Sequence, residues 1–352
     1  MRPLALLAAA LLLPVTALAE DRPWLSVEGY AEIENDWAYD SDDADAEHND
    51  LYATVEVAPT LAFAAGWSLS GTFVFEPVQD FNPGEDGFFD NEGLYMEELF
   101  LAYGADTWGV RAGKINPAFG ALWDADGIWV GDFAEDYELT EKIGAGAHYT
   151  LAGAHTLSAA AFFADTSTLS DSAFTRRGQV RQADGGASNT GDPSSFVVSL
   201  TGAKMEALPG LSYGLYVRHL AQGDADVGPE FDEEQGLAAN LGYAWAATER
   251  LGLSVMGEVA HLDHFGGGAD DHTYAGAVVM ATWDARWSLA LGHTTRWVDR
   301  AGGGDDDDHL TQASVGYAWP CGLYTHAGWR GAREGGVDTH SLGGVFGYAF
   351  AF

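Results

Sequence analysis

The residues best suited to chemistry lie in one stretch, 116–137, which reads NPAFGALWDADGIWVGDFAEDY. Its acidic side chains are Asp124, Asp126, Asp132, Glu135 and Asp136. Apolar residues stand among them: Phe119, Trp123, Ile128, Trp129 and Phe133. Carboxylates attract cations, whereas a solvent-exposed connection has no need of so many apolar side chains. The stretch therefore predicts a loop that is anchored against another part of the protein, as in a loop folded into a barrel.

Histidines raise the question of catalysis. A barrel hydrolase needs a Ser–His or Asp–His arrangement. The chain has His261, His264, His272 and His293, but their spacing assigns none of them to a nucleophile. We predict no catalytic residue and no enzyme activity.

Two acidic runs, Asp40–Asp45 and Asp305–Asp308, raise the question of metal binding. Neither has the spacing of an EF-hand, with Gly at position 6 and Glu at position 12. We predict no metal centre and no cofactor, beyond Ca²⁺ held weakly in acidic external loops.

Charge and targeting narrow the class of protein. The chain carries 53 acidic and 16 basic residues, a net charge of −37, which argues against nucleic acid as a partner. Arg2, the apolar run Leu4–Leu13 and the motif Ala17-Leu18-Ala19 predict a signal peptide over 1–19. That run is shorter than the roughly 20 residues that a membrane-spanning helix needs. The mature chain, 20–352, is therefore expected to be exported.

The last eleven residues, 342–352, have the pattern of a β-strand. One parity holds Leu342, Phe346, Tyr348, Phe350 and Phe352, and the other holds Gly, Val and Ala. Successive side chains of a strand point to opposite faces, so one face is bulky and the other nearly bare. This suits a strand with lipid outside and a lumen inside. An apolar C-terminal strand of a soluble sandwich is the alternative.

About sixteen such segments follow one another, and short and long connections alternate between them. Short turns are expected at 64–66, 104–106, 153, 207–210, 247–249, 284–285 and 320–321. Long polar loops are expected at 36–50, 77–87, 116–137, 165–194, 221–234, 263–271, 298–308 and 331–340. A soluble sandwich has no reason to sort its loops in this way. We predict an all-β transmembrane antiparallel β-barrel of about sixteen strands in the outer membrane of a Gram-negative bacterium, with short periplasmic turns and long external loops.

Tryptophans agree with this topology. Those within a few residues of a short turn are Trp67, Trp108, Trp245, Trp283, Trp287 and Trp319. Aromatic residues gather at membrane interfaces, so these tryptophans predict a periplasmic girdle.

If the aromatic parity faces outward, a polar set faces the lumen: Glu28, Glu32, Glu34, Glu56, Glu76, Arg111, His148, Arg218, Asn240, Glu258, Arg296, Gln312, Ser314, His326 and Arg330. Arg or Lys on the lipid face would cost about 2–4 kcal/mol at mid-depth. A polar interior at this strand number predicts a water-filled channel. Glu97 and Glu98 have opposite parity, so one of them should lie beyond the apolar band.

In strand number, loop alternation and terminal Phe, the chain resembles the general bacterial porin family, and the segment 113–120 also looks porin-like. The resemblance implies that 116–137 is the constriction loop and that its five acids face basic wall residues. The candidates on the wall are Arg111, Lys114, Lys142, Arg218, Arg296 and Arg330. Basic residues are fewer than in that family, which implies a weaker transverse field and a stronger preference for cations.

The ending resembles the closing strand of outer-membrane barrels. This implies that Phe352, Phe350 and Tyr348 form the signal for the barrel-assembly machinery. Family resemblance also implies a homotrimer. Lipopolysaccharide is a further expected partner, at the acidic external loops.

These observations predict a porin that lets small hydrophilic solutes and ions diffuse passively and prefers cations. Two alternatives remain open: a substrate-specific porin for a sugar or another small solute, and a plugged structural or adhesive barrel. The physiological solute does not follow from the sequence.

Overall fold

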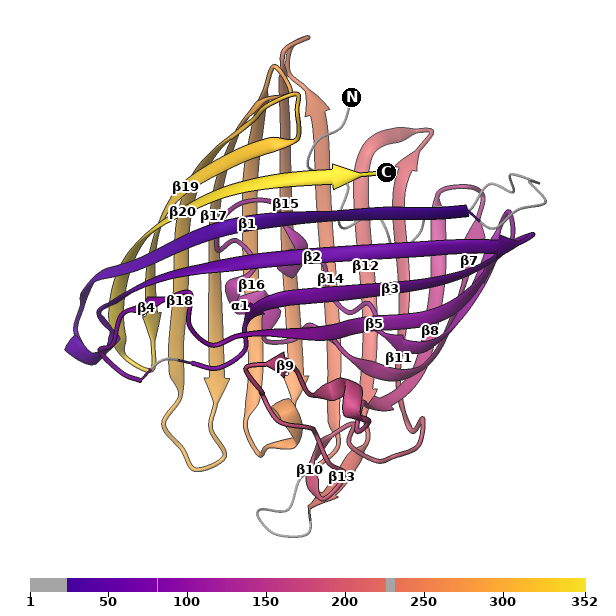
Figure 1. The fold of residues 1–352 in the computed structure, drawn as a ribbon, viewed down its shortest axis with the longest axis horizontal. Coiled ribbons are helices and arrows are strands. Elements are labelled where there is room, and N and C mark those ends of the chain that lie inside the picture. Colours follow the sequence, from indigo (N-terminus) through magenta and orange to yellow (C-terminus); the bar gives the residue numbers. More distant parts are fainter. Residues whose placement is uncertain (1–23, 81, 226–231) are drawn as a thin grey trace.

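Long antiparallel strands pair in sequence order around a closed barrel in the computed structural model, which describes residues 24–80, 82–225 and 232–352 (Figure 1). The sheet has 18 strands, of which β4 and β9 are two residues long, so sixteen form the barrel. The sixteen are β1 (Trp24–Ser41), β2 (His48–Ala64), β3 (Trp67–Pro77), β5 (Glu92–Gly104), β6 (Trp108–Ile115), β7 (Lys142–Leu151), β8 (His155–Ala164), β11 (Ser195–Met205), β12 (Leu208–Leu220), β14 (Glu234–Ala246), β15 (Leu251–Asp263), β16 (Asp271–Trp283), β17 (Trp287–Asp299), β18 (Asp306–Ala318), β19 (Leu323–Glu334) and β20 (Val337–Ala351). The predicted signal peptide lies outside the described residues.

Pairing of the first strand with the last closes the barrel. β1 runs antiparallel to β20 from Glu28↔Ala351 to Ser41↔Thr339. Closure leaves no strand edge unpaired, so the predicted all-β antiparallel barrel is confirmed. No helix among the described residues is long and apolar enough to cross a membrane.

Minor elements lie in the long connections. They are η2 (Ala44–Ala46), β4 (Gly87–Phe88), η3 (Leu122–Asp124), α1 (Asp132–Glu135), η4 (Thr168–Ser170), β9 (Ala173–Phe174), β10 (Asp184–Ala187), β13 (Gln222–Ala225) and η5 (Phe265–Gly267). β4 pairs with β2, β9 pairs with β5, and β10 and β13 form a small separate sheet.

Strict alternation of short and long connections is wrong at one place, and the first long connection is shorter than predicted. The predicted loop 331–340 is a two-residue turn at Gly335–Gly336, with φ of +55° and +87°. Its polar residues continue the two strands, and Arg333 Nη1 donates to Asp338 Oδ2 across the hairpin at 2.6 Å. The predicted loop 36–50 is likewise mostly strand, because β1 continues to Ser41 and β2 begins at His48. The polar residues at these two places belong to strands that extend beyond the apolar band of the barrel.

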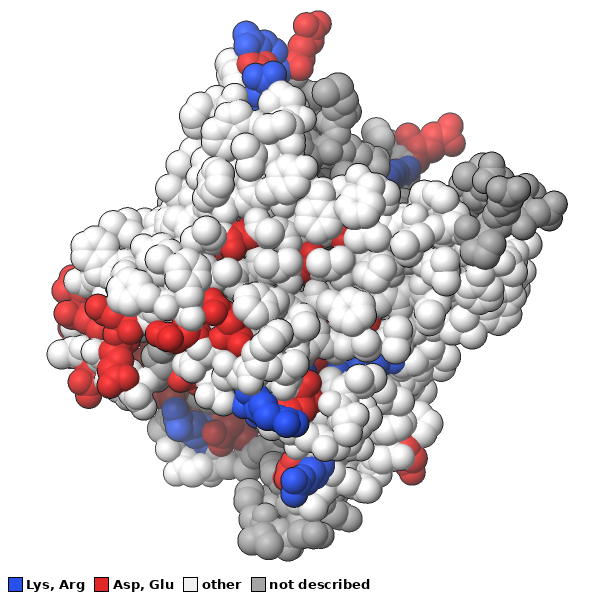
Figure 2. Space-filling model, in the orientation of Figure 1, with Lys and Arg blue, Asp and Glu red and all other residues white. Residues whose placement is uncertain are grey.

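The outward face is apolar and bears the predicted girdle. All six tryptophans named above are exposed on strand ends next to short turns. On β20, the predicted outward residues Leu342, Phe346 and Tyr348 are exposed, whereas Gly347 on the other parity is buried. Asp and Glu gather at the left edge of the view, where β1 ends and β2 begins, and the broad surface to the right is largely uncharged (Figure 2).

The inward face differs from the prediction in two respects. Its β11–β18 side is largely apolar, with Leu262, Tyr274 and Leu310 at most 2% exposed, so the lumen is not polar throughout. The expectation for Glu97 and Glu98 is also wrong. The β3–β5 register shifts between Thr72↔Glu98 and Phe73↔Met96, so Glu97 is an extra residue. Such a bulge changes the side-chain alternation, and both glutamates face inward toward Asn116.

Candidate functional site

Asn116 turns the chain from the barrel wall into the lumen. β6 ends at Ile115, and Pro117 has no N–H to continue the ladder. Asn116 Nδ2 donates to Glu97 Oε1 at 2.7 Å, and its backbone N–H donates to Glu98 Oε1 at 2.8 Å. Its Oδ1 accepts from the N–H of Glu141 at 2.8 Å. Asn116 therefore ties both ends of the connection 116–141, here called loop 3, to the wall.

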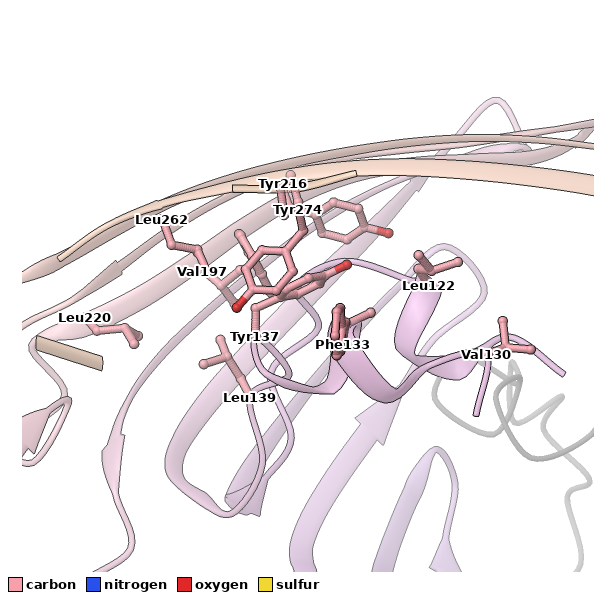
Figure 3. Close-up of a cluster of buried hydrophobic side chains, with 14 of the residues drawn as sticks. Leu122, Val130, Phe133, Tyr137, Leu139, Val197, Tyr216, Leu220, Leu262 and Tyr274 are labelled. Carbon is pink, nitrogen blue, oxygen red and sulfur yellow. The ribbon is translucent and has the colours of Figure 1, made fainter. Parts of the chain in front are cut away.

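Loop 3 packs its apolar side chains onto the inner face of the barrel (Figure 3). Phe119, Leu122 and Tyr137 are at most 1% exposed. Tyr137 packs edge-on against Tyr274 of β16, with ring centroids 5.0 Å apart. In the close-up, Leu122, Phe133 and Tyr137 project toward the strands that carry Tyr216 and Tyr274 (Figure 3). The anchoring predicted from the mixture of acidic and apolar residues is present, and α1 lies inside the barrel (Figure 1).

Glu258 of β15 anchors loop 3. Its carboxylate accepts from the backbone N–H of Ala121 at 2.7 Å and of Leu122 at 3.0 Å. It also accepts from Tyr137 Oη at 2.7 Å and from Asn240 Nδ2 at 3.0 Å. Hydrogen bonds to a charged acceptor contribute about 1.5–3 kcal/mol each. The buried Glu258 is thus stabilised without a basic partner.

Two predicted wall arginines pair with predicted loop acids. Arg296 of β17 binds Asp136 at 2.8 Å, and also Asp308 and Glu334, each at 2.7 Å. Arg330 of β19 pairs with Asp132. These two acids therefore hold loop 3 on the wall, and their charge is balanced there.

Arg218 of β12 and Arg111 of β6 also bind the loop, but through its backbone. Arg218 pairs with Glu234 and donates to the carbonyl of Tyr137 at 2.6 Å. Arg111 donates to the carbonyl of Asn116 at 2.7 Å and lies 3.6 Å from Glu98.

The two predicted wall lysines form no ion pair with any of the five predicted loop acids among the described residues. Lys114 is 2% exposed, binds Asp165 at 2.9 Å and Glu141 at 3.1 Å, and donates to the carbonyl of Leu169 at 2.9 Å. It secures the connection 165–194 to the wall and does not face the open lumen. Lys142 begins β7 and forms no ion pair among the described residues.

Four other carboxylates of loop 3 have no such partner among the described residues. In the described part of the chain, Asp124, Asp126 and Glu135 form no ion pair or side-chain hydrogen bond, and neither does Glu138, which the sequence analysis missed. Partial burial and then Asp126 raise the pKa of Asp124 to about 7. Burial and then Asp132, Asp136 and Glu76 raise the pKa of Glu135 to about 7. Burial and then Glu97, Glu135, Asp124 and Glu98 raise the pKa of Glu138 to about 8.

Strands β1, β2, β3 and β5 form an acidic wall, and Glu135 and Glu138 lie near it, since Glu76 acts on Glu135 and Glu97 and Glu98 act on Glu138. No Lys or Arg occurs between Arg22 and Arg111. Predicted wall residues Glu28, Glu32 and Glu56 lie here, and so do the inward carboxylates Glu34, Asp36, Glu76 and Glu97. The run without basic residues is the sequence signal that could have identified this wall.

Tyrosines hold the wall carboxylates in place. Tyr95 Oη donates to Glu76 Oε1 at 2.6 Å, and Tyr52 Oη donates to Glu34 Oε2 at 3.2 Å. Tyr324 of β19 reaches across β20 to Glu32. It can do so because β20 has Gly347 at this point, where a Cβ would lie 2.4 Å from the Tyr324 ring. Each tyrosine is a neutral donor, so it orients the carboxylate without supplying a counter-ion.

A cavity of about 690 Å³ opens at the loop end of this wall. Its acidic lining comprises Asp43, Asp45, Asp50, Glu76, Asp80 and Glu85. We call it the mouth cavity.

Other candidate residues lie outside this passage. His261 and His293 are exposed and bind Thr273 and Thr311 at 2.9 and 2.8 Å. Among the described residues, no group of three or more His, Cys, Asp or Glu is placed to hold a metal ion. Phe352 pairs with Val27 through both backbone groups, at 2.8 and 3.0 Å.

Similarity to known proteins is confined to structure. No family model and no curated protein sequence matches the chain. The outer membrane channel DcaP of Acinetobacter baumannii superposes with a TM-score of 0.60 at 12% identity, over 94% of this chain and 99% of that chain. OccK1 (OpdK) of Pseudomonas aeruginosa gives 0.56 at 10% identity, over 93% and 99%. OmpT of Vibrio cholerae, solved in a trimer form, gives 0.55 at 11% identity, over 94% and 100%. The fold is thus that of Gram-negative outer-membrane barrels, and its outer surface is largely apolar.

Proposed function

We propose that this protein is an outer-membrane channel through which small hydrophilic solutes and ions diffuse, with a preference for cations. The observation that carries the proposal is the distribution of charge inside the barrel. Free carboxylates of loop 3 approach a wall, β1–β5, that has carboxylates and no basic residue.

Pairing of the arginines supports this preference. Arg218 and Arg296 could offset the acidic passage, but each is bound to a carboxylate on the side that loop 3 covers. Arg330 is paired with Asp132 and also lies near Asp36 of the acidic wall, because it stacks on Trp129, whose Nε1 donates to Asp36. Charges are screened beyond about 8 Å at physiological salt. An ion in the passage therefore experiences mainly the nearby free carboxylates.

Two further parts of the proposal concern assembly and chemistry. A homotrimer is supported by the trimer form of Vibrio cholerae OmpT. A channel, as opposed to an enzyme, is supported by DcaP, an outer membrane channel of the same fold, and by the outward position of His261 and His293.

Single-channel recording of the refolded protein in planar bilayers tests the proposal. Under a KCl gradient we expect discrete conductance steps and a reversal potential of the sign that K⁺ permeation gives. Glu249→Gln, in a periplasmic turn, should leave that potential unchanged, whereas the pair Glu76→Gln and Glu97→Gln should move it toward zero. Folded barrel without steps would favour a plugged structural barrel, and anion selectivity would contradict the cation preference.

A further inference from the structure

The fourth long connection, 165–194, is built into the rim of the barrel. β6 ends early because loop 3 leaves the wall at Asn116. Beyond that point, β9 from this connection pairs with β5, at Gly93↔Phe174 and Leu94↔Ala173. Lys114 bonds to the same connection at Asp165 and Leu169. The residues after β9 are therefore held at a defined position beside the passage.

Arg177, three residues after β9, has a fixed side chain. Its Nη2 lies 2.5 and 2.8 Å from the two carboxylate oxygens of Glu141, and its Nε donates to the carbonyl of Ser170 at 2.9 Å. Its guanidinium carbon lies 4.0 Å from the ring centroid of Tyr95. A guanidinium over an aromatic face is attracted by the ring quadrupole. Three contacts thus fix the position of the positive charge.

That charge lies in the mouth cavity. Tyr95 belongs to the acidic wall, since its hydroxyl donates to Glu76. Arg177, Tyr95 and Glu76 all line the cavity, together with Asp50 and Asp80. Among the described residues that line this cavity, Arg177 is the only Lys or Arg side chain. It is therefore the basic group that a cation meets on entering the acidic passage.

The neighbouring arginine has a different environment. Arg176 pairs with Asp171, and its side chain is 75% exposed, against 22% for Arg177. Arg176 does not line the cavity. The two adjacent residues carry the same charge in the same segment, and only one reaches the mouth.

We propose that Arg177 is a specificity-determining residue of the channel. Its guanidinium offsets the negative charge of Glu141 at the rim of the mouth cavity and so limits how strongly the acidic passage prefers cations. This inference rests on the proposed channel function and names a residue that regulates its charge selectivity.

Reversal potentials of four variants test the role of Arg177. Arg177→Gln should raise the K⁺/Cl⁻ permeability ratio by about two-fold, as expected for one charge acting over about a Debye length. Arg176→Gln should leave the ratio unchanged. Arg177→Lys should keep most of the wild-type ratio, because the charge is retained while the paired hydrogen bonds to Glu141 are lost.

Glu141→Gln separates charge from structure. It weakens the same contact to Arg177 but removes a negative charge, so the ratio should fall. If the substitutions acted by loosening the connection 165–194, the K⁺/Cl⁻ permeability ratio would instead change in the same direction for Arg177→Gln and Glu141→Gln. Equal ratios for Arg177→Gln and wild type, or equal effects of Arg176→Gln and Arg177→Gln, would overturn the inference. Absence of any KCl conductance in the wild type would contradict the channel function itself.

Discussion

At the scale of single residues, the presence of a hydrogen-bond donor or counter-ion decides which acids hold loop 3 and which face the passage. Glu258, Asp132 and Asp136 are engaged with donors on loop 3 or the wall. Glu135 and Glu138 are not, although they lie in the same short segment. A carboxylate without a donor or counter-ion in a partly buried place has a raised pKa.

This difference predicts that selectivity depends on pH near neutrality. The pKa values of Asp124, Glu135 and Glu138 are raised to about 7, 7 and 8. A carboxyl group is neutral below its pKa and negative above it, so the passage gains negative charge as pH rises through this range. We expect the K⁺/Cl⁻ permeability ratio to increase from pH 6 to pH 9, measured by reversal potentials.

A variant with Asp124→Asn, Glu135→Gln and Glu138→Gln provides the control. Its permeability ratio should be lower at pH 9 and nearly flat over the same range. A pH dependence that survives in this variant would show that other groups produce it.

At the scale of elements, loop 3 divides the barrel interior into a packed side and an acidic side. Its apolar residues form one core with the inner faces of β11–β18. The loop lies directly against Gly328 of β19, because a Cβ at this position would lie 3.4 Å from Cβ of Ile128, an ordinary contact distance. That distance is close to the about 3.5–4.5 Å between the Cβ atoms of a disulfide.

A disulfide therefore tests where loop 3 lies. In a Cys321→Ala background, Ile128→Cys with Gly328→Cys should cross-link under mild oxidation, as measured by mass spectrometry of a protease digest. The bond should leave the conductance near the wild-type value, because the loop already lies on this wall. Ile128→Cys alone is the control. Failure of the pair to cross-link would contradict the described position of the loop.

At the scale of the whole molecule, closure depends on the last strand. β20 pairs with both β19 and β1, and the backbone of Phe352 still bonds to Val27. The Phe352 side chain is 76% exposed, and its ring stacks on Phe350 at 6.0 Å. The Phe352 ring packs on its neighbour Phe350, so we expect it to contribute little to the stability of the folded barrel.

We therefore predict that Phe352→Ala impairs assembly more than stability. The amount of folded barrel in outer membranes of expressing cells should fall several-fold, as measured by heat-dependent mobility in gels. The same variant refolded in detergent should give a barrel with nearly wild-type unfolding in urea. Phe346→Ala, on the same outward face, is the matched control, and an equal loss in cells for both variants would argue against a terminal signal.

The sequence by itself determined the features that depend on local periodicity. Side chains alternate along Leu342–Phe352 and tryptophans lie next to short turns, as expected for strands with one face toward lipid. The strand number follows from counting such alternating segments. Mixed acidic and apolar residues in 116–137 were enough to predict an anchored loop, because apolar side chains need a surface on which to pack.

Only the tertiary structure decided how charges combine. Asp136 meets Arg296 across 160 residues of sequence, and Ala121 meets Glu258 across 137. No local pattern encodes such distant contacts. The two-residue turn at Gly335–Gly336 and the bulge at Glu97 depend on the register with neighbouring strands. For the same reason, the resemblance to porins implied acids and bases facing each other across a pore, whereas folding pairs the arginines with anchoring acids and leaves the carboxylates of Glu135 and Glu138 free.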